Sequence, residues 1–233
     1  MIGSATRTSP LDSRLTATLA TFLAERPPGS DEDVHMVSAN VAHVIERCSQ
    51  PGDLVFDPFA GFGTTIAQAV LLDRGALGIE LLPERVDYLR SRVPQAQIIE
   101  GDARELLRVI HKTERRSPAS LVDLIVTAPP YMTFENHEAD PLTAYEKNDG
   151  DYTRYLAELG LVAAQCAQVV KPGGYVVWNL ADIFHMGSTT HLIRDCTNVL
   201  SQHLMHVGNT EITWDTYPHD LVADALLVFQ RPV

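Results

Sequence analysis

Short apolar runs alternate with amphipathic stretches along the chain, and this alternation predicts strands separated by helices. The runs rich in Val, Ile, Leu and aromatic residues predict seven strands. The first starts at Leu54, and the others span residues 76–81, 96–103, 121–128, 175–182, 211–217 and 224–232. Helical spacing predicts helices at residues 11–25, 37–49, 64–75, 83–93, 103–112, 152–170 and 189–205. This order predicts an α/β fold with a mostly parallel sheet covered on both faces, closed by a C-terminal antiparallel hairpin.

Unusual residues follow the predicted strands. In open α/β sheets, ligands bind at the carboxyl ends of the strands. The first strand runs into "DPFAGFGTT", the second ends at Glu80, the third at Asp102, the fourth at "APPY" and the fifth at "NLADIFHMG". We therefore expect one site at this edge of the sheet.

The glycines of the first loop suit a ligand that approaches the backbone closely. Gly61 and Gly63 permit positive φ angles, and the helix that starts at Thr64 and Thr65 exposes N–H groups suited to a carboxylate or a phosphate. A dinucleotide fingerprint would need a third glycine, where this chain has Ile66. A tight turn without a ligand is the alternative interpretation.

Two carboxylates at strand ends complete a nucleoside-like pattern. Glu80 is placed to bind ribose hydroxyls, although it is also explained as a solvated strand-end residue. Asp102 is placed to accept a hydrogen bond from an adenine amino group, or it caps the helix that follows.

These motifs resemble those of a known enzyme family. "DPFAGFGTT" (57–65) with "APPY" (128–131) resembles the D-P-F-x-G-x-G-T-T and D/N/S-P-P-Y/F motifs of the S-adenosylmethionine-dependent amino-methyltransferases, the N-4/N-6 DNA methylase family. The resemblance covers about residues 35–182. It implies a Rossmann-like class I methyltransferase domain over residues 35–233, with a helical extension at 1–34.

The resemblance implies S-adenosylmethionine as the cofactor. The methionine end would lie against residues 57–63 and the segment 35–40, the ribose against Glu80 and the adenine against Asp102. The implied cofactor-binding residues are Asn40, Asp57, Pro58, Phe59, Gly61, Gly63, Thr64, Thr65, Glu80, Leu81, Asp102 and Ala103.

The Pro-Pro-Tyr turn supplies the expected chemistry. An exocyclic amine on a heteroaromatic ring is a poor nucleophile, because its lone pair is delocalised into the ring. Acceptors at a stiff turn, led by the Pro129 carbonyl, would localise that lone pair, and the Tyr131 ring would stack on the acceptor and align it. The expected catalytic residues are Ala128, Pro129, Pro130, Tyr131 and Asp182. The alternative is that the prolines only end a strand.

Ala128 departs from the family pattern, which has Asp, Asn or Ser at this position. Alanine cannot accept a hydrogen bond from the amine, so backbone carbonyls or another residue must do so. Asp182 and Asn179 are the nearest candidates, and His185 could take a proton. Each of the three is also explained as an ordinary polar loop residue.

Charge and length argue against duplex DNA, the acceptor typical of the family. The net charge of the 233 residues is −12, whereas DNA binding draws on Lys and Arg. We expect no separate target-recognition domain, and the acidic segment 132–151 would repel phosphates. The spacing His203-x-x-His206 lacks the partners of a metal site, so no metal is expected.

The three cysteines, Cys48, Cys166 and Cys196, are widely spaced and lie in apolar contexts. They predict buried free thiols of a cytoplasmic protein. No signal peptide, membrane span or membrane partner is expected, and a homodimer stays open.

The sequence thus predicts an S-adenosylmethionine-dependent N-methyltransferase that acts on an amino nitrogen of a planar, nucleobase-like acceptor. Two alternatives stay open. One is a small-molecule (natural-product) methyltransferase. The other is a catalytically silent S-adenosylmethionine-binding partner subunit, which only Ala128 favours.

Overall fold

The computed structural model describes residues 8–27, 35–114, 121–134, 139–144 and 150–233. In these residues the strands are β1 (Arg14–Ala17), β2 (Leu54–Asp57), β3 (Gly75–Glu80), β4 (Gln97–Glu100), β5 (Val122–Thr127), β6 (Val170–His185), β7 (Ser188–Thr190), β8 (Met205–Trp214) and β9 (Leu221–Gln230). The α-helices are α1 (Leu19–Ala24), α2 (Ser38–Cys48), α3 (Thr64–Leu71), α4 (Pro83–Arg92), α5 (Leu106–Glu114), α6 (Tyr152–Val169) and α7 (Leu192–Leu200). Two short 3₁₀ helices are η1 (Ala103–Glu105) and η2 (Pro141–Thr143).

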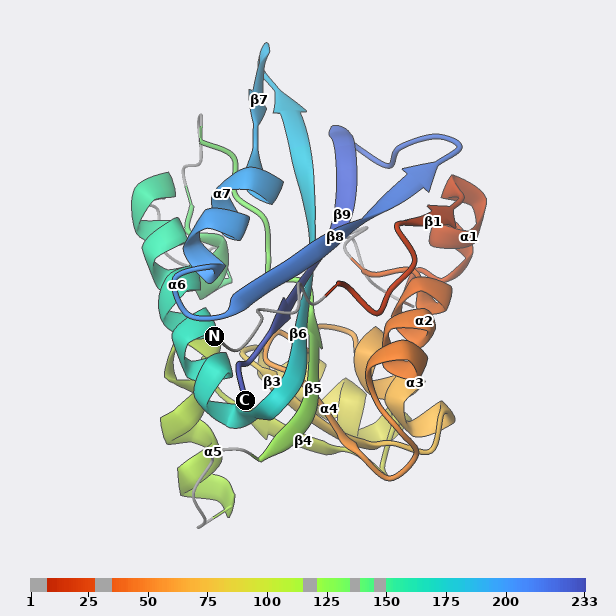
Figure 1. Cartoon of the computed structure of the whole chain (residues 1–233), viewed down its shortest axis with the longest axis vertical. Coiled ribbons are helices and arrows are strands. Elements are labelled where there is room, and N and C mark those ends of the chain that lie inside the picture. The colour runs from red at the N-terminus through yellow and green to blue at the C-terminus, as the bar shows by residue number, and fades with distance from the viewer. Residues whose placement is uncertain (1–7, 28–34, 115–120, 135–138, 145–149) are drawn as a thin grey trace, which may run out of the picture.

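One mixed sheet runs through the molecule in the order β1-β8-β9-β6-β5-β2-β3-β4, with β7 paired to β6 (Figure 1). The pairs from β4 to β6 are parallel, while β9 is antiparallel to both β6 and β8. The expected α/β architecture and C-terminal hairpin are therefore confirmed. The sheet has nine strands instead of seven, because β1 and β7 join the seven that the sequence predicts.

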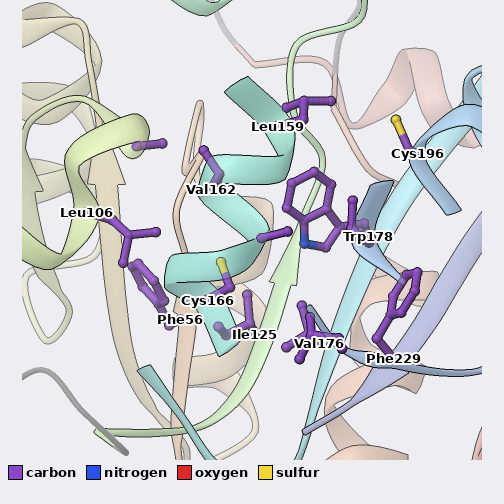
Figure 2. Close-up of a cluster of buried hydrophobic side chains, with 14 of the residues drawn as sticks. Phe56, Leu106, Ile125, Leu159, Val162, Cys166, Val176, Trp178, Cys196 and Phe229 are labelled. Atoms are coloured by element: carbon purple, nitrogen blue, oxygen red, sulfur yellow. The ribbon is translucent and has the colours of Figure 1, made fainter. Parts of the chain in front are cut away.

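Helices cover both faces of the sheet, as the apolar runs of its central strands require. Helices α1 to α4 lie on one side and α5 to α7 on the other (Figure 1). Each face has its own buried cluster of apolar side chains. Figure 2 shows Val176 and Trp178 of β6 gathered with Val162 and Cys166 of α6 in the cluster on the second face.

Two of the predicted helices are wrong in part. The segment 11–25 was expected to be one helix, but residues 14–17 form β1 and only Leu19–Ala24 are helical. Its strand pairs in parallel with β8, almost 200 residues later, which no local pattern reveals. The helix expected at 189–205 is shortened at both ends, since β7 ends at Thr190 and β8 begins at Met205.

The helix predicted at residues 64–75 ends earlier than Gly75. Helix α3 stops at Leu71, Asp73 takes a positive φ of 62°, and Gly75 is already the first residue of β3. Tertiary pairing explains the difference, because Gly75 lies opposite Leu54 in the β2–β3 ladder. The helix expected at 103–112 is likewise divided into η1 and a longer α5.

The three cysteines are free thiols, as expected. Cys166 and Cys196 are fully buried, whereas Cys48, which was expected to be buried as well, is partly exposed. Burial raises the pKa of the Cys48 thiol to about 12. None of the described helices has the length and apolarity that a membrane span requires.

Candidate functional site

A cavity of about 520 Å³ opens at the carboxyl ends of β2, β3 and β5, where the sequence predicts the site. Its volume lies in the range of small-molecule sites. Most of the predicted residues line it: Asn40, Asp57, Pro58, Phe59, Gly61, Gly63, Thr64, Glu80, Leu81, Asp102, Ala103, Ala128, Pro129, Pro130 and Tyr131. Thr65 and Asp182 do not.

The loop between β2 and α3 bends back through two left-handed glycines. Gly61 has φ 52° and Gly63 has φ 85°, and Gly63 is the residue from which α3 starts. Glycine takes such angles without strain, so the loop can bring backbone N–H groups to the cavity wall. The loop therefore has the backbone conformation that its glycines predict.

Asp57 ends β2 at the base of this loop and is 2% exposed. Its Oδ1 accepts hydrogen bonds from the Thr127 hydroxyl at 2.5 Å and from the Phe59 N–H at 3.0 Å. Burial raises the pKa of Asp57 to about 6, although the hydrogen bonds from Thr127 and Thr65 oppose that rise. Thr65 therefore supports Asp57 from below instead of facing the cavity.

Glu80 ends β3 and supports the glycine loop from the neighbouring strand. Its Oε2 accepts from the Gly61 N–H at 2.8 Å, and its Oε1 accepts from the Leu82 N–H at 2.9 Å. Burial raises the pKa of this carboxyl group, and the hydrogen bonds lower it. Because each carboxylate oxygen can accept more than one hydrogen bond, Glu80 can hold the loop and still receive two hydroxyl donors.

Asp102 combines both roles that the sequence left open. It caps η1 by accepting from the Arg104 N–H at 2.8 Å, and it lines the cavity. The Arg104 guanidinium lies 2.6 Å from Asp102 Oδ2 and 2.9 Å from Glu158, so it fixes the carboxylate in place. The cap and a ligand contact do not exclude each other here.

The Pro-Pro-Tyr turn is held by two tyrosine hydroxyl groups. Tyr131 donates to the Asn179 carbonyl at 3.2 Å, and Tyr155 donates to the Pro130 carbonyl at 3.0 Å. Among the hydrogen bonds of the described residues, none uses the Pro129 carbonyl, so it stays open to accept from a ligand. Burial raises the pKa of Tyr131 well above its ordinary range, which keeps its hydroxyl protonated.

Beside this turn lie three hydrogen-bonded polar side chains, of which the sequence pattern indicates only Asn179. Asp224 of β9 is 6% exposed and accepts from Asn179 Nδ2 at 2.6 Å and from Trp214 Nε1 at 2.8 Å. Burial raises the pKa of Asp224 to about 6. All three side chains line the cavity, and Asp224 and Trp214 belong to the hairpin β8–β9.

The placement of Asp182 gives no support to its expected catalytic role. Its carboxylate faces α7, where Oδ1 accepts from the Ile193 N–H at 3.0 Å and Oδ2 lies 3.1 Å from His191 Nδ1. Side chains alternate along a strand, so Asp182 and Asn179 point to opposite faces of β6. His185 does line the cavity, with its Nδ1 3.4 Å from Asp220 Oδ2.

Aromatic side chains from distant elements line the far part of the cavity. Phe22 of α1 stacks on His35 with ring centroids 4.3 Å apart and meets the Trp214 ring edge-on at 5.6 Å. His219 lies against the same Phe22 ring. The family resemblance pointed to residue 35 through the segment 35–40, but no sequence signal pointed to Phe22, Trp214 or His219, because α1 and the β8–β9 hairpin meet only in the folded chain.

The acidic segment 132–151 is described in part. Asp140 and Asp151 are helix caps, which accept from the Leu142 and Arg154 N–H groups. The remaining acidic residues of that segment, Glu135, Glu138, Glu146 and Asp149, lie outside the described residues. The described residues contain no group of His, Cys, Asp or Glu side chains arranged to hold a metal ion, and His206 stands in β8 with its Nε2 2.7 Å from Asn209.

The cavity fits S-adenosylmethionine by its charge as well as its size. Asp57, Glu80 and Asp224 are buried carboxylates, which would suit the positive sulfonium and ammonium groups of that molecule. Arg85 is the one Lys or Arg side chain that lines the cavity in the described part of the chain. Such a lining is a poor match for a ligand with several phosphates.

In a comparison with known protein families, a family model described as "DNA methylase" matches residues 38–91, which include the glycine loop and Glu80. The match does not reach the Pro-Pro-Tyr turn.

Solved structures, most of them described as methyltransferases, resemble more than four fifths of the chain. The N-methyltransferase NodS from Bradyrhizobium japonicum, also solved with S-adenosylhomocysteine, superposes with a TM-score of 0.55 at 14% identity, over 84% of this chain and 94% of that one. An S-adenosylmethionine-dependent methyltransferase from Methanosarcina mazei gives a TM-score of 0.58 at 12% identity, over 82% and 97%. The [4+2]-cyclase SpnF gives 0.57 at 13%, over 84% and 80%. The chain therefore has the Rossmann-like fold of S-adenosylmethionine-dependent methyltransferases.

Proposed function

We propose that this chain is an S-adenosylmethionine-dependent N-methyltransferase, and that its acceptor is an amino nitrogen on a planar, nucleobase-like ring. The carrying observation is that one cavity joins the Gly61–Gly63 loop and Glu80 to the Pro129 carbonyl and the Tyr131 ring. Methyl transfer needs a site for the cofactor next to a site for the amine. The loop with Glu80 would form the first of these sites, and the Pro-Pro-Tyr turn would form the second.

The residues divide the work between the two halves. Glu80 and Asp102 would receive the ribose hydroxyls and the adenine amine, and the Asp57–Gly63 loop would hold the amino-acid end. S-adenosylmethionine supplies a methyl group on a positively charged sulfur, whose C–S bond breaks as the N–C bond forms and the C–S electrons stay on sulfur. The methylated nitrogen then loses one proton to water.

The Pro129 carbonyl would draw on an amine N–H, while the Tyr131 ring would hold the acceptor flat. Two hydrogen bonds keep this turn stiff. Tyr155 donates to the Pro130 carbonyl, and Tyr131 donates to the Asn179 carbonyl. Alignment of the nitrogen with the methyl carbon is the main contribution that such a turn makes.

A free small-molecule amine is the second candidate acceptor. The aromatic wall formed by Phe22, Trp214 and His219 favours it, because this wall offers rings for stacking and contains no Lys or Arg side chain. NodS, a protein of similar fold, is described as an N-methyltransferase. SpnF shows that the fold alone does not settle the reaction.

The test is a screen for transfer of a labelled methyl group. The panel contains free adenine and cytosine nucleosides, single-stranded DNA, tRNA, duplex DNA and small aromatic amines. We expect an N-methylated product, identified by mass spectrometry, from a free or single-stranded acceptor. Calorimetry with S-adenosylhomocysteine runs in parallel: binding without transfer to any acceptor would favour the silent partner subunit, and no binding would overturn the proposal.

A further inference from the structure

We propose that the amide oxygen of Asn179, held in place by Asp224, takes over the amine-accepting role that the family assigns to the residue at position 128. This inference rests on the proposed function. It makes Asn179 a catalytic residue of this chain and Asp224 a positioning residue. It also explains how Ala128 can stand in the motif without silencing the site.

The sheet register places Asn179 beside Ala128. In the parallel pair of β5 and β6, Thr127 lies opposite Trp178, so the next residues along the two strands are Ala128 and Asn179. Alternation along the strands turns both of these side chains away from the Trp178 core, and both line the cavity. An amide on the neighbouring strand thus occupies the space beside the position that the family motif gives to Asn, Asp or Ser.

Chemistry fixes which way the Asn179 amide points. Its nitrogen lies 2.6 Å from Asp224 Oδ1 and 3.2 Å from the Ala225 carbonyl. A backbone carbonyl can only accept, so the atom that faces it must be the NH₂ group. Both N–H donors are thereby used inside the protein, and the amide oxygen is left as the free acceptor.

The free oxygen is open to the cavity. Asn179 as a whole is only 9% exposed, yet its Oδ1 is not among the buried side-chain atoms that lack a partner. No hydrogen bond of the described residues uses this oxygen. An acceptor that is open to the cavity and has no protein partner can take a hydrogen bond from a ligand.

Asp224 holds the amide through a connected pair of strands. Its second oxygen accepts from Trp214 Nε1 at 2.8 Å, so the carboxylate is fixed from β8 while it fixes Asn179 on β6. The Tyr131 hydroxyl donates to the Asn179 backbone carbonyl at 3.2 Å. The stacking ring and the proposed acceptor are therefore anchored to the same residue, and together they favour a flat primary amine that keeps a second N–H for the Pro129 carbonyl.

The test needs no knowledge of the acceptor. Sinefungin is the analogue of S-adenosylmethionine that carries C–NH₃⁺ in place of S⁺–CH₃, so it presents N–H donors where the amine and methyl group meet. S-adenosylhomocysteine lacks that group. We expect the protein to prefer sinefungin in calorimetry, and we expect Asn179→Ala to reduce that preference by about tenfold or more, the loss for one hydrogen bond to a charged group.

The control variant is Asp182→Asn, which changes a carboxylate of the same strand outside the cavity and should keep the preference. Asp224→Ala should lose the preference and Asp224→Asn, which retains an acceptor oxygen, should lose less of it. Should Asn179→Ala bind S-adenosylhomocysteine less than half as well as the unchanged protein, Asn179→Ser is the second variant.

The outcomes separate the two proposals. A sinefungin preference that survives Asn179→Ala, with S-adenosylhomocysteine affinity unchanged, overturns the role of Asn179 and leaves the proposed function standing. A wild-type protein that binds neither molecule overturns the proposed function and this inference with it.

Discussion

Glu80 has two tasks in the structure: it holds the glycine loop and it faces the cavity. Glu80→Ala removes acceptors from the Gly61 and Leu82 N–H groups and from the proposed ribose contact. We expect S-adenosylhomocysteine to bind about 1.5–3 kcal/mol more weakly in calorimetry, the range for hydrogen bonds to a charged group. Glu100→Ala is the matched control, because Glu100 lies opposite Glu80 in the β3–β4 ladder but is exposed and outside the cavity. Unchanged affinity in Glu80→Ala would exclude the ribose role.

Tyr131 lines the cavity, and its hydroxyl donates to the Asn179 carbonyl of β6. Tyr131→Ala should slow methyl transfer to the acceptor found in the screen. The activation free energy should rise by about 1–3 kcal/mol, the value of one aromatic ring stacked on a base. Affinity for S-adenosylhomocysteine should stay within about twofold, because other residues make the proposed hydrogen bonds to the cofactor. Tyr131→Phe keeps the ring and serves as the control. Parallel losses of transfer and affinity in Tyr131→Ala would contradict the stacking role.

The turn from β2 into α3 depends on its two glycines to different degrees. A Cβ at Gly63, with φ 85°, would lie 2.2 Å from Leu89 Cδ2, whereas a Cβ at Gly61, with φ 52°, meets nothing closer than 3.8 Å. We expect Gly61→Ala to lower the free energy of unfolding by about 1 kcal/mol and Gly63→Ala by about 2–3 kcal/mol, because a clash adds to the left-handed strain. Urea denaturation without ligand measures both, and equal losses would show that the Leu89 contact relaxes freely.

Strands β6, β8 and β9 meet at Asp224. The carboxyl group of Asp224 should make the stability of the protein depend on pH. Burial raises the pKa of Asp224 from 3.8 to about 6. The folded protein therefore binds a proton on Asp224 more readily than the unfolded chain, so its stabilising effect is complete below about pH 3.8 and is lost as the pH rises through about 6. Compared with Asp224→Asn, the wild type should gain about 1 kcal/mol in unfolding free energy between pH 7 and pH 5.

The measurement is a urea titration of both proteins at each pH. Asp57 has a similarly raised pKa, but it is present in both proteins, so its effect cancels in the difference. A difference that stays constant or shrinks on acidification would contradict the raised pKa of Asp224.

At the scale of the whole molecule, the charge opposes binding to duplex DNA. The net charge is −12, and Arg85, the one described Lys or Arg at the cavity, lies over the Phe62 ring at 4.7 Å. Four other basic residues could be considered for phosphate contacts. Arg154 lies 3.8 Å from Asp140, while Arg115, Arg116 and Lys147 lie outside the described residues. Flipping a base out of a duplex would add a cost that backbone contacts normally offset.

We therefore expect duplex DNA to bind with a dissociation constant of about 10⁻⁴ M or weaker at physiological salt. Fluorescence anisotropy with S-adenosylhomocysteine present, at two salt concentrations, compares duplex DNA with single-stranded DNA and tRNA. Micromolar binding to the duplex with a steep salt dependence would restore the DNA methylase interpretation of the acceptor.

Local sequence is sufficient to predict the half of the site that is built from residues close together in the chain. The Asp57–Thr65 loop, Glu80, Asp102 and the Pro129–Tyr131 turn all stand directly after strands, so the alternation of apolar runs was enough to bring them to one edge of a parallel sheet. Their positions follow from local sequence because each is covalently tied to the end of a strong, central strand.

The proposed acceptor half of the site depends on contacts between distant parts of the chain. Whether Asn179 or Asp182 faces the cavity depends on the phase of side-chain alternation in β6, and a single-residue shift would exchange them. Asp224 and Trp214 reach the site through the antiparallel pairing of β9, and β1 exists because β8 lies beside it far along the chain. Such contacts between distant segments leave no local periodicity in the sequence, since the partner that gives each residue its role is supplied by folding.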